Sequence, residues 1–168
     1  MSKNSKILQL VEFVLHGNSY ALPIQNVQEI IKLIEIVNVP KAPTFVEGVI
    51  NLRDKIVPVI DLKKRFSLKA KSIDNSTMSS NTDNSSRIII SDISNYTVGL
   101  IVDHVHQVID VDESSFEKKP DITTSIDQDF IAGMVKHKNK IIIILNPLKI
   151  LTSSETSNLN IIECNNRP

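Results

Sequence analysis

The stretch GVINLRDKIVPVIDLKKRF, residues 48–66, has a second copy in the chain as GMVKHKNKIIIILNPLKIL, residues 133–151. The two copies align without a gap. The alignment places Gly48 opposite Gly133, Lys55 opposite Lys140, Ile56 opposite Ile141, Asp61 opposite Asn146, and Lys64 opposite Lys149. Each copy indicates a strand, a tight polar turn, a β-branched strand and a residue able to cap a short helix. The repeat predicts two related β-modules in one chain.

The segments that precede the two copies match as well, at an offset of 78 (98 − 20). The apolar positions that correspond are Tyr20, Ile24, Val27, Ile30 and Ile31 in the first half, and Val98, Val102, Val105, Val108 and Ile109 in the second. The repeated hairpins differ by 85 (133 − 48), so the second half contains a longer connector, at residues 113–129. The duplication therefore extends over most of the chain.

Short strands joined by tight turns predict a mainly β fold made of small closed barrels. The strands expected are 7–15, 20–24, 48–52, 55–60, 87–93 and 96–102, with a four-residue turn at 16–19. The apolar spacing from Ile24 to Ile34 predicts one or two helical turns, followed by an extended segment at 35–39. Short helices are expected after Asp61, ending near Phe66, and from Asn146 to about Ser153.

These elements predict two subdomains, at about 14–66 and 87–152, with a short helix across one end of each barrel. The N-terminal strand 7–13 is expected to be exchanged between them at the waist. Residues 67–86 are poor in large apolar side chains and indicate a flexible loop, and residues 153–168 indicate a polar tail.

Composition argues against several classes of partner. Nineteen Lys and Arg balance nineteen Asp and Glu, so no excess positive charge is available for phosphate backbones or anionic lipid. Aromatic residues make up 4% of the chain, which argues against base stacking and hence against nucleic acid. The polar start of the chain has no signal-peptide core, and the longest aliphatic run, 141–145, is too short to span a bilayer. We therefore expect a cytoplasmic protein that does not insert into the membrane.

No pattern in the sequence indicates catalysis, a cofactor or a metal. His104 and His106 would share one face of a strand, but no cysteine or third histidine is near them in sequence to complete a zinc site. A triad using His104 and Asp103 has no nucleophile motif. The four glycines are isolated, so no phosphate-binding loop is present. The expected site is therefore a surface for binding other proteins.

A set of short motifs gives the chain a family resemblance. In order along the chain they are Phe13-Val-Leu, Tyr20-Ala-Leu-Pro-Ile, Val27-Gln-Glu-Ile30, Val39-Pro-Lys-Ala-Pro43, Gly48-Val-Ile-Asn-Leu-Arg53, Val57-Pro-Val-Ile-Asp-Leu62 and Val98-Gly-Leu-Ile-Val-Asp103. Their order and spacing resemble the CheW family of chemotaxis coupling proteins over residues 7–152. Each motif alone is common in strands, whereas the ordered set is specific.

The resemblance implies two SH3-like five-stranded β-barrel subdomains with short helices and no catalytic, cofactor or metal site. It implies an adaptor, recruited to membrane receptor arrays, that couples methyl-accepting chemotaxis receptors to the histidine kinase CheA. In such proteins the cytoplasmic tip of the receptor lies in the groove between the barrels. The regulatory domain of the kinase, which has the same fold, pairs end-on with a barrel.

Three candidate partner-binding residues are charged. Arg53 is either a turn cation, solvated or held by Asp54 or Asp61, or a partner-facing arginine with five fixed donors. Glu29 is either a solvated helix residue or, by its family position, part of the receptor contact. Asp54 replaces the glycine that usually follows Asn-Leu-Arg in the family. Aspartate tolerates the positive φ that glycine supplies, and Asn139 in the duplicate supports such a turn, but the added carboxylate could blunt the use of Arg53.

The other candidates are apolar. Val27, Val105 and Ile109 are each ordinary core positions, but together they could line the groove that receives a receptor helix. Gly48 marks either a close approach of two backbone segments or a role at the receptor surface. Two alternative functions also remain: a coupling protein of a parallel chemosensory system, such as one controlling pili, and a small-molecule or oligonucleotide-binding barrel.

Overall fold

The computed structural model describes residues 6–66, 85–118, 128–152 and 155, so all but the last two residues of the loop expected at 67–86, and nearly all of the tail expected at 153–168, lie outside the described residues. The strands are β1 Ile7–Leu15, β2 Asn18–Pro23, β3 Val27–Lys32, β4 Val46–Leu52, β5 Lys55–Asp61, β6 Arg87–Ile93, β7 Tyr96–Val102, β8 His104–Asp112, β9 Phe116–Glu117, β10 Ile131–His137 and β11 Lys140–Leu145. The helices are α1 Leu62–Arg65 and α2 Pro147–Ile150, with 3-10 turns η1 Ile24–Asn26, η2 Glu113–Ser115 and η3 Gln128–Phe130.

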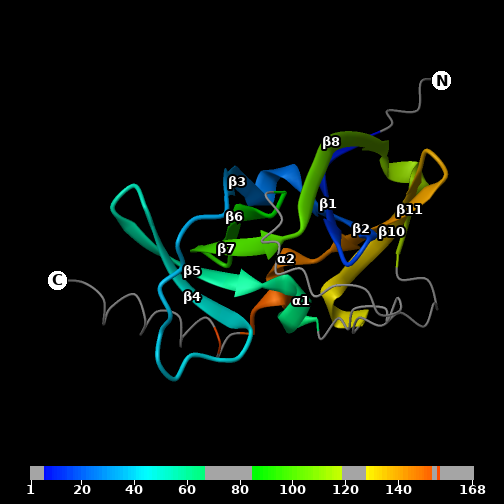
Figure 1. The fold of residues 1–168 in the computed structure, drawn as a ribbon. Helices are drawn as coiled ribbons and strands as arrows, with labels where there is room; N and C mark the ends of the chain where they lie inside the picture. The colour runs from blue at the N-terminus through cyan, green and yellow to red at the C-terminus, as the bar shows by residue number, and fades with distance from the viewer. Residues whose placement is uncertain (1–5, 67–84, 119–127, 153–154, 156–168) are drawn as a thin grey trace, which may run out of the picture.

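The strands form two sheets (Figure 1). One has five strands in the order β3-β6-β7-β5-β4, and the other has six in the order β8-β1-β2-β11-β10-β9. The helices α1 and α2 lie between the sheets near the middle of the molecule. The predicted mainly β, two-part fold is therefore confirmed.

Each sheet closes on itself in the same way. After β3, the chain reaches the opposite edge of the five-stranded sheet, where Val37 and Val49 exchange two backbone hydrogen bonds of 2.9 Å. After β8 and η2, β9 pairs with the far strand β10 at Met134, which lies 85 residues after Val49 (134 − 49). Because β8 and β9 are consecutive in the chain and are separated only by the turn η2, we count them together as one strand. Each closed sheet then has five strands. We call them barrel one (β3–β7) and barrel two (β1, β2 and β8–β11).

The barrels do not follow the expected subdomain boundaries. The strands of barrel one all lie between residues 27 and 102, whereas those of barrel two lie before residue 24 and between residues 104 and 145, on either side of barrel one in sequence. The division expected at 14–66 and 87–152 cuts both barrels, and the whole β1–β2 hairpin joins the second half instead of strand 7–13 alone. The reason is parallel pairing: β2 pairs with β11, and β7 pairs with β5. The first hairpin of the first repeat, β1–β2, thus belongs to barrel two with β8–β11. The first hairpin of the second repeat, β6–β7, belongs to barrel one with β3–β5.

The helix expected from Ile24 to Ile34 is wrong apart from the single turn η1. From Val27 to Lys32 the chain forms β3, paired with β6. A bulge between Val27 and Glu29 shifts the register by one residue, but burial still alternates along β3. The spacing resembles that of a helix because Ile30, which is 39% exposed, lies on the outer face of the strand next to the half-buried Ile31. In barrel two the same shift occurs between Glu12 and Phe13, opposite β8.

The hairpin turns confirm the predicted conformation of Asp54 and Asn139, whose φ angles are +65° and +62°. Arg53 also has a positive φ, +50°, so the turn is of the two-residue kind in which both residues are left-handed. The first hairpin turn is shorter than expected, because β1 ends at Leu15 and β2 begins at Asn18.

The predicted caps are confirmed in both repeats. The Asp61 carboxylate accepts a hydrogen bond from the backbone N–H of Lys63 at 2.9 Å, and the Asn146 side chain accepts one from Leu148 at 3.1 Å. Both helices are a single turn, and α2 ends at Ile150, earlier than expected.

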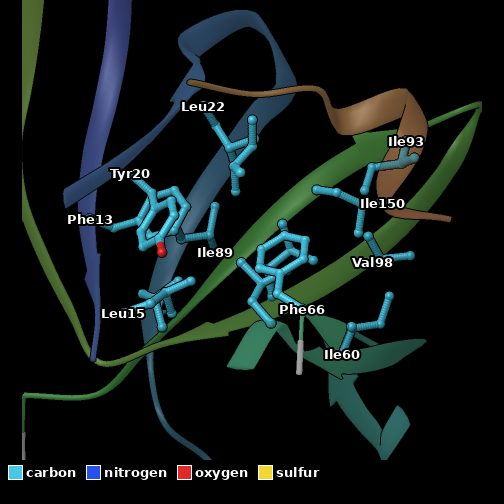
Figure 2. Packing of buried hydrophobic residues seen from close by; sticks show 14 of the residues in the cluster. Phe13, Leu15, Tyr20, Leu22, Ile60, Phe66, Ile89, Ile93, Val98 and Ile150 are labelled. Carbon is cyan, nitrogen blue, oxygen red and sulfur yellow. The ribbon is translucent and has the colours of Figure 1, made fainter. Parts of the chain in front are cut away.

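A central cluster of apolar side chains joins the two barrels (Figure 2). Barrel two contributes Phe13 and Tyr20, whose rings stack at 6.2 Å, and barrel one contributes Ile60 and Ile89. The ring centroid of Phe66, the residue that follows α1, lies 5.0 Å from that of Phe130. Each barrel also has a smaller interior cluster of its own. Because the central cluster draws on both sheets, burial of its apolar surface holds the barrels together.

Candidate partner-binding site

The structure brings together two of the predicted charged residues, Glu29 and Arg53. The Nη2 atom of Arg53 lies 2.9 Å from Oε2 of Glu29, while 77% of the arginine side chain remains exposed. Glu29 lies on β3, at one edge of barrel one, and Arg53 lies in the turn that follows β4, at the other edge. The pair therefore connects β3 with the β4–β5 turn, the two sides that meet where the barrel closes, and leaves the arginine exposed to solvent. Neither Asp54 nor Asp61 forms an ion pair with Arg53.

Gly48 is buried at a bulge in β4, with φ of +151°. A Cβ atom there would lie 2.1 Å from the carbonyl oxygen of Val37, the residue that closes the barrel. The close approach of two backbone segments explains the glycine without a contact surface. Gly133, its repeat partner, would meet the Phe116 ring at 2.4 Å, so both closures depend on a missing side chain.

Val27 and Val105 occupy equivalent places in the two barrels. Each is half-buried, and each packs against the central cluster that joins the barrels. Val27 pairs with Ser91 on β6, and Val105 pairs with Phe13 on β1, at the corresponding side of each bulge. The two valines therefore lie at the seam, the boundary between the two barrels, and their role as the lining of a groove for a receptor helix stays a prediction.

Ile109 is not available as a groove lining. Only 4% of its surface is exposed, and it packs inside barrel two with Leu10 and Val111. Ile109 and Val111 are two residues apart on β8, so both side chains point to the barrel interior. The neighbouring Val108 is 51% exposed.

Asp103 is a residue of the seam that the sequence indicated only as part of a motif and of a triad without a nucleophile. It lies where the chain leaves β7 for β8, and it connects both barrels. Its carboxylate accepts a hydrogen bond of 2.9 Å from the backbone N–H of His16 in barrel two. The same carboxylate lies 2.7 Å from Nζ of Lys63 on α1. Asp103 therefore stabilises the point where the chain passes from barrel one to barrel two.

Arg65 makes the second polar connection across the seam, and composition gave no signal for it. Its Nε donates to the carbonyl oxygen of Ile150 on α2 at 2.7 Å, and Nη2 lies 3.1 Å from the Glu155 carboxylate. The guanidinium carbon lies 4.7 Å from the Phe45 ring centroid and 5.1 Å from that of Phe130. These contacts tie α1 to α2.

Glu12 is a buried carboxylate in barrel two, with 1% of its surface exposed. Nζ of Lys140 lies 3.0 Å from it, and Nε2 of Gln107 donates to it at 3.3 Å. Burial raises the pKa of the Glu12 carboxyl, but hydrogen bonds from Lys140, Ser19 and Gln107 outweigh it and hold the pKa below the ordinary 4.5. The equivalent position in barrel one is the fully buried Ile90, at an offset of 78 (90 − 12). The ion pair of Glu12 with Lys140 is thus a structural feature of barrel two and connects the two repeats within it.

His104 and His106 lie on β8 with ring centroids 6.1 Å apart, and both are exposed. Within residues 6–66, 85–118, 128–152 and 155, no group of three or more His, Cys, Asp or Glu side chains is placed to hold a metal ion. In the same ranges, no helix is long and apolar enough to cross a membrane.

Comparisons with known proteins place the chain in a family. A family model described as a CheW-like domain matches residues 9–155. The chain is 32% identical over 159 residues to a chemotaxis protein CheW of Treponema pallidum, covering 95% of this chain and 91% of the relative. It is 33% identical over 143 residues to a chemotaxis protein CheW of Bacillus subtilis, covering 85% and 86%.

A solved structure shows the same fold. The scaffolding protein TtCheW of Thermoanaerobacter tengcongensis superposes with a TM-score of 0.76 at 39% sequence identity, covering 92% of this chain and 94% of that one. The match of sequence and fold extends over both barrels and the seam between them. This chain therefore belongs to the CheW-like family and is a CheW-type coupling protein of chemotaxis.

Proposed function

We propose that this protein is a non-catalytic scaffold that couples methyl-accepting chemotaxis receptors to the histidine kinase CheA, in the cytoplasm at membrane receptor arrays. The observation that carries the proposal is the family membership over nearly the whole chain, together with a structural relative described as a scaffolding protein. The two barrels, joined by a shared core and by Asp103 and Arg65, suit a rigid adaptor.

The proposed mechanism is avidity. A rigid body with two modest interfaces holds receptor and kinase at one relative orientation, and the second contact then forms at a high effective concentration. Repetition of both contacts would extend an array. Such a protein contributes the relative orientation of receptor and kinase and catalyses no reaction itself.

In this proposal the helical tip of a receptor binds along the seam near Val27 and Val105, with Glu29 at its border. These valines are half-buried and apolar, as helix-in-groove recognition requires. Arg53 remains largely exposed while it pairs with Glu29, so it can exchange that partner for a carboxylate on another protein. Gly48 shapes the surface by allowing the barrel to close.

The test is the autophosphorylation rate of the kinase with and without receptor and with and without this protein. We expect this protein to raise the rate only when receptor is present, and Arg53→Ala to reduce the increase. Lys64→Ala, which removes the exposed ion pair between Lys64 on α1 and Glu47 on β4, is the control variant. An equal rate with and without the protein, at saturating receptor, would rule out the proposal.

A further inference from the structure

Two exposed imidazoles, those of His104 and His106, lie side by side on β8 where the chain enters barrel two. Val105 between them packs against the central cluster, so the side chains before and after it point to solvent. The register shift between β1 and β8 leaves His106 without a partner on β1, as the extra residue of a bulge. Bulges redirect side chains, and this one leaves both imidazoles on one surface.

The separation of the two rings is one that a single metal ion can bridge. Their centroids lie 6.1 Å apart, and their planes are inclined by 60°. Metal–nitrogen bonds of about 2.1 Å place the centroids of two imidazoles on one ion between about 4.5 Å and 6.4 Å apart. Because both side chains are exposed, small rotations can turn one nitrogen of each ring toward the ion.

Both rings are available as ligands. Within residues 6–66, 85–118, 128–152 and 155, neither imidazole forms a hydrogen bond or an ion pair. The adjacent carboxylate of Asp103 is engaged by the backbone N–H of His16 and by Lys63, so it is not free to serve as a third ligand. The donor set on this surface therefore consists of two neutral nitrogens.

The repeated fold does not require the two histidines. The equivalent residues in barrel one, at an offset of 78 (104 − 26), are Asn26 and Gln28, on either side of Val27. Barrel one forms the same bulge there without an imidazole. The asparagine and glutamine therefore indicate which side chains can replace the histidines without disturbing the strand.

We propose that His104 and His106 together bind one divalent metal ion of the class that prefers imidazole, namely Cu²⁺, Ni²⁺ or Zn²⁺. Two nitrogens without a carboxylate do not suit Mg²⁺ or Ca²⁺, which require oxygen ligands. Among the three metals, the general order of affinities predicts that Cu²⁺ binds most tightly. A structural zinc site has four protein ligands, whereas this exposed site leaves the other positions on the ion to water. The inference does not rest on the proposed function.

The experiment titrates NiCl₂ and ZnCl₂ into the untagged full-length protein by calorimetry, with MgCl₂ as the negative probe. A Cys164→Ser background removes the one thiol of the chain as a competing ligand. We expect one Ni²⁺ per chain. His104→Asn and His106→Gln should each weaken Ni²⁺ binding about 10-fold or more, because the second nitrogen binds intramolecularly at a high effective concentration.

The matched control is His137→Gln, which removes a histidine at the end of β10 and should leave Ni²⁺ binding unchanged. A readout without any substitution comes from paramagnetic Cu²⁺, which should broaden the amide NMR signals of residues around 104–106 first. The double variant His104→Asn/His106→Gln should lose this local broadening and keep the remaining spectrum.

Equal Ni²⁺ affinity of the parent and the double variant would overturn the inference, as would broadening centred away from residues 104–106. Loss of binding in one single variant but not in the other would show that one imidazole alone holds the ion, which also overturns it.

Discussion

At the scale of single residues, Gly48 carries the closure of barrel one. The chain after β3 crosses so close to β4 that no side chain fits, and the φ of +151° is one that other residues rarely adopt. Two hydrogen bonds between Val37 and Val49 depend on that approach. Gly48, which the sequence suggested as a possible contact residue, is thus needed for the close packing of two backbone segments.

We predict that Gly48→Ala lowers the free energy of unfolding by about 3 kcal/mol or more, through backbone strain and loss of the Val37–Val49 bonds. Gly17→Ala is the matched control, because Gly17 also has a positive φ, +79°, but nothing lies within 4 Å of its added Cβ. It should cost about 1–2 kcal/mol. Equal losses in urea unfolding would contradict the close approach.

Glu12 shows what a single buried carboxylate contributes. Since its folded pKa lies below 4.5, its ionised form stabilises the protein above that pH. The contribution is lost as the pH falls through the folded pKa. The Glu12→Gln variant lacks this titration.

We therefore predict that the parent is more stable than Glu12→Gln at about pH 7, and that the difference shrinks as the pH falls from about 4.5 toward 3. Urea unfolding of both proteins over this range provides the measurement. A difference that stays constant down to about pH 3 would show that the Glu12 carboxyl does not titrate as its contacts require.

At the scale of elements, the short helix α1 is held in place by side-chain contacts with other parts of the molecule, because the backbone hydrogen bonds of a single turn are too few to stabilise it. Its last residue, Arg65, reaches the carbonyl of Ile150 on α2 and stacks against Phe45 and Phe130. The helix is too short to be stable alone, so tertiary contacts determine its place.

We predict that Arg65→Ala lowers the free energy of unfolding by about 2–3 kcal/mol, and that Arg65→Lys recovers little of it, because lysine lacks the planar donor group. Lys64→Ala on the same helix should cost less than about 1 kcal/mol, since its pair with Glu47 is exposed. Chemical unfolding of the three variants provides the comparison, and an equal cost for Arg65→Ala and Lys64→Ala would contradict it.

At the scale of the whole molecule, the two barrels are nested in sequence and share one core. Barrel one lies between the β2 and β8 segments of barrel two, and the central cluster includes side chains from both. An adaptor with this construction keeps the relative orientation of its two surfaces, because neither barrel can tilt without opening the shared core.

We predict a single cooperative unfolding transition. Ile89→Ala in barrel one should lower the free energy of unfolding by about 2–5 kcal/mol and shift the transitions of both barrels together. Tyr20 lies in barrel two and Tyr96 in barrel one, so single Tyr→Phe variants let fluorescence report each barrel separately. Two separated transitions in the Ile89→Ala protein would contradict the shared core.

Local patterns in the sequence determined the elements that depend on near neighbours. The repeated hairpins, the caps at Asp61 and Asn146, and the positive φ of Asp54 follow from turn and capping chemistry that acts within a few residues. The ordered motifs also predicted the family. These features need no knowledge of distant contacts.

Tertiary structure alone decided how the elements combine. The apolar spacing after Ile24 is typical of a helix, but the segment forms the strand β3, since pairing with β6 outweighs local spacing. The exchange of hairpins between repeats depends on the parallel contacts of β2 with β11 and β7 with β5, which join residues far apart in the chain. The burial of Ile109 and the pairing of Arg53 with Glu29 follow from that assembly. A side chain's neighbours are fixed by packing across strands, and the order of residues along one strand does not contain that information.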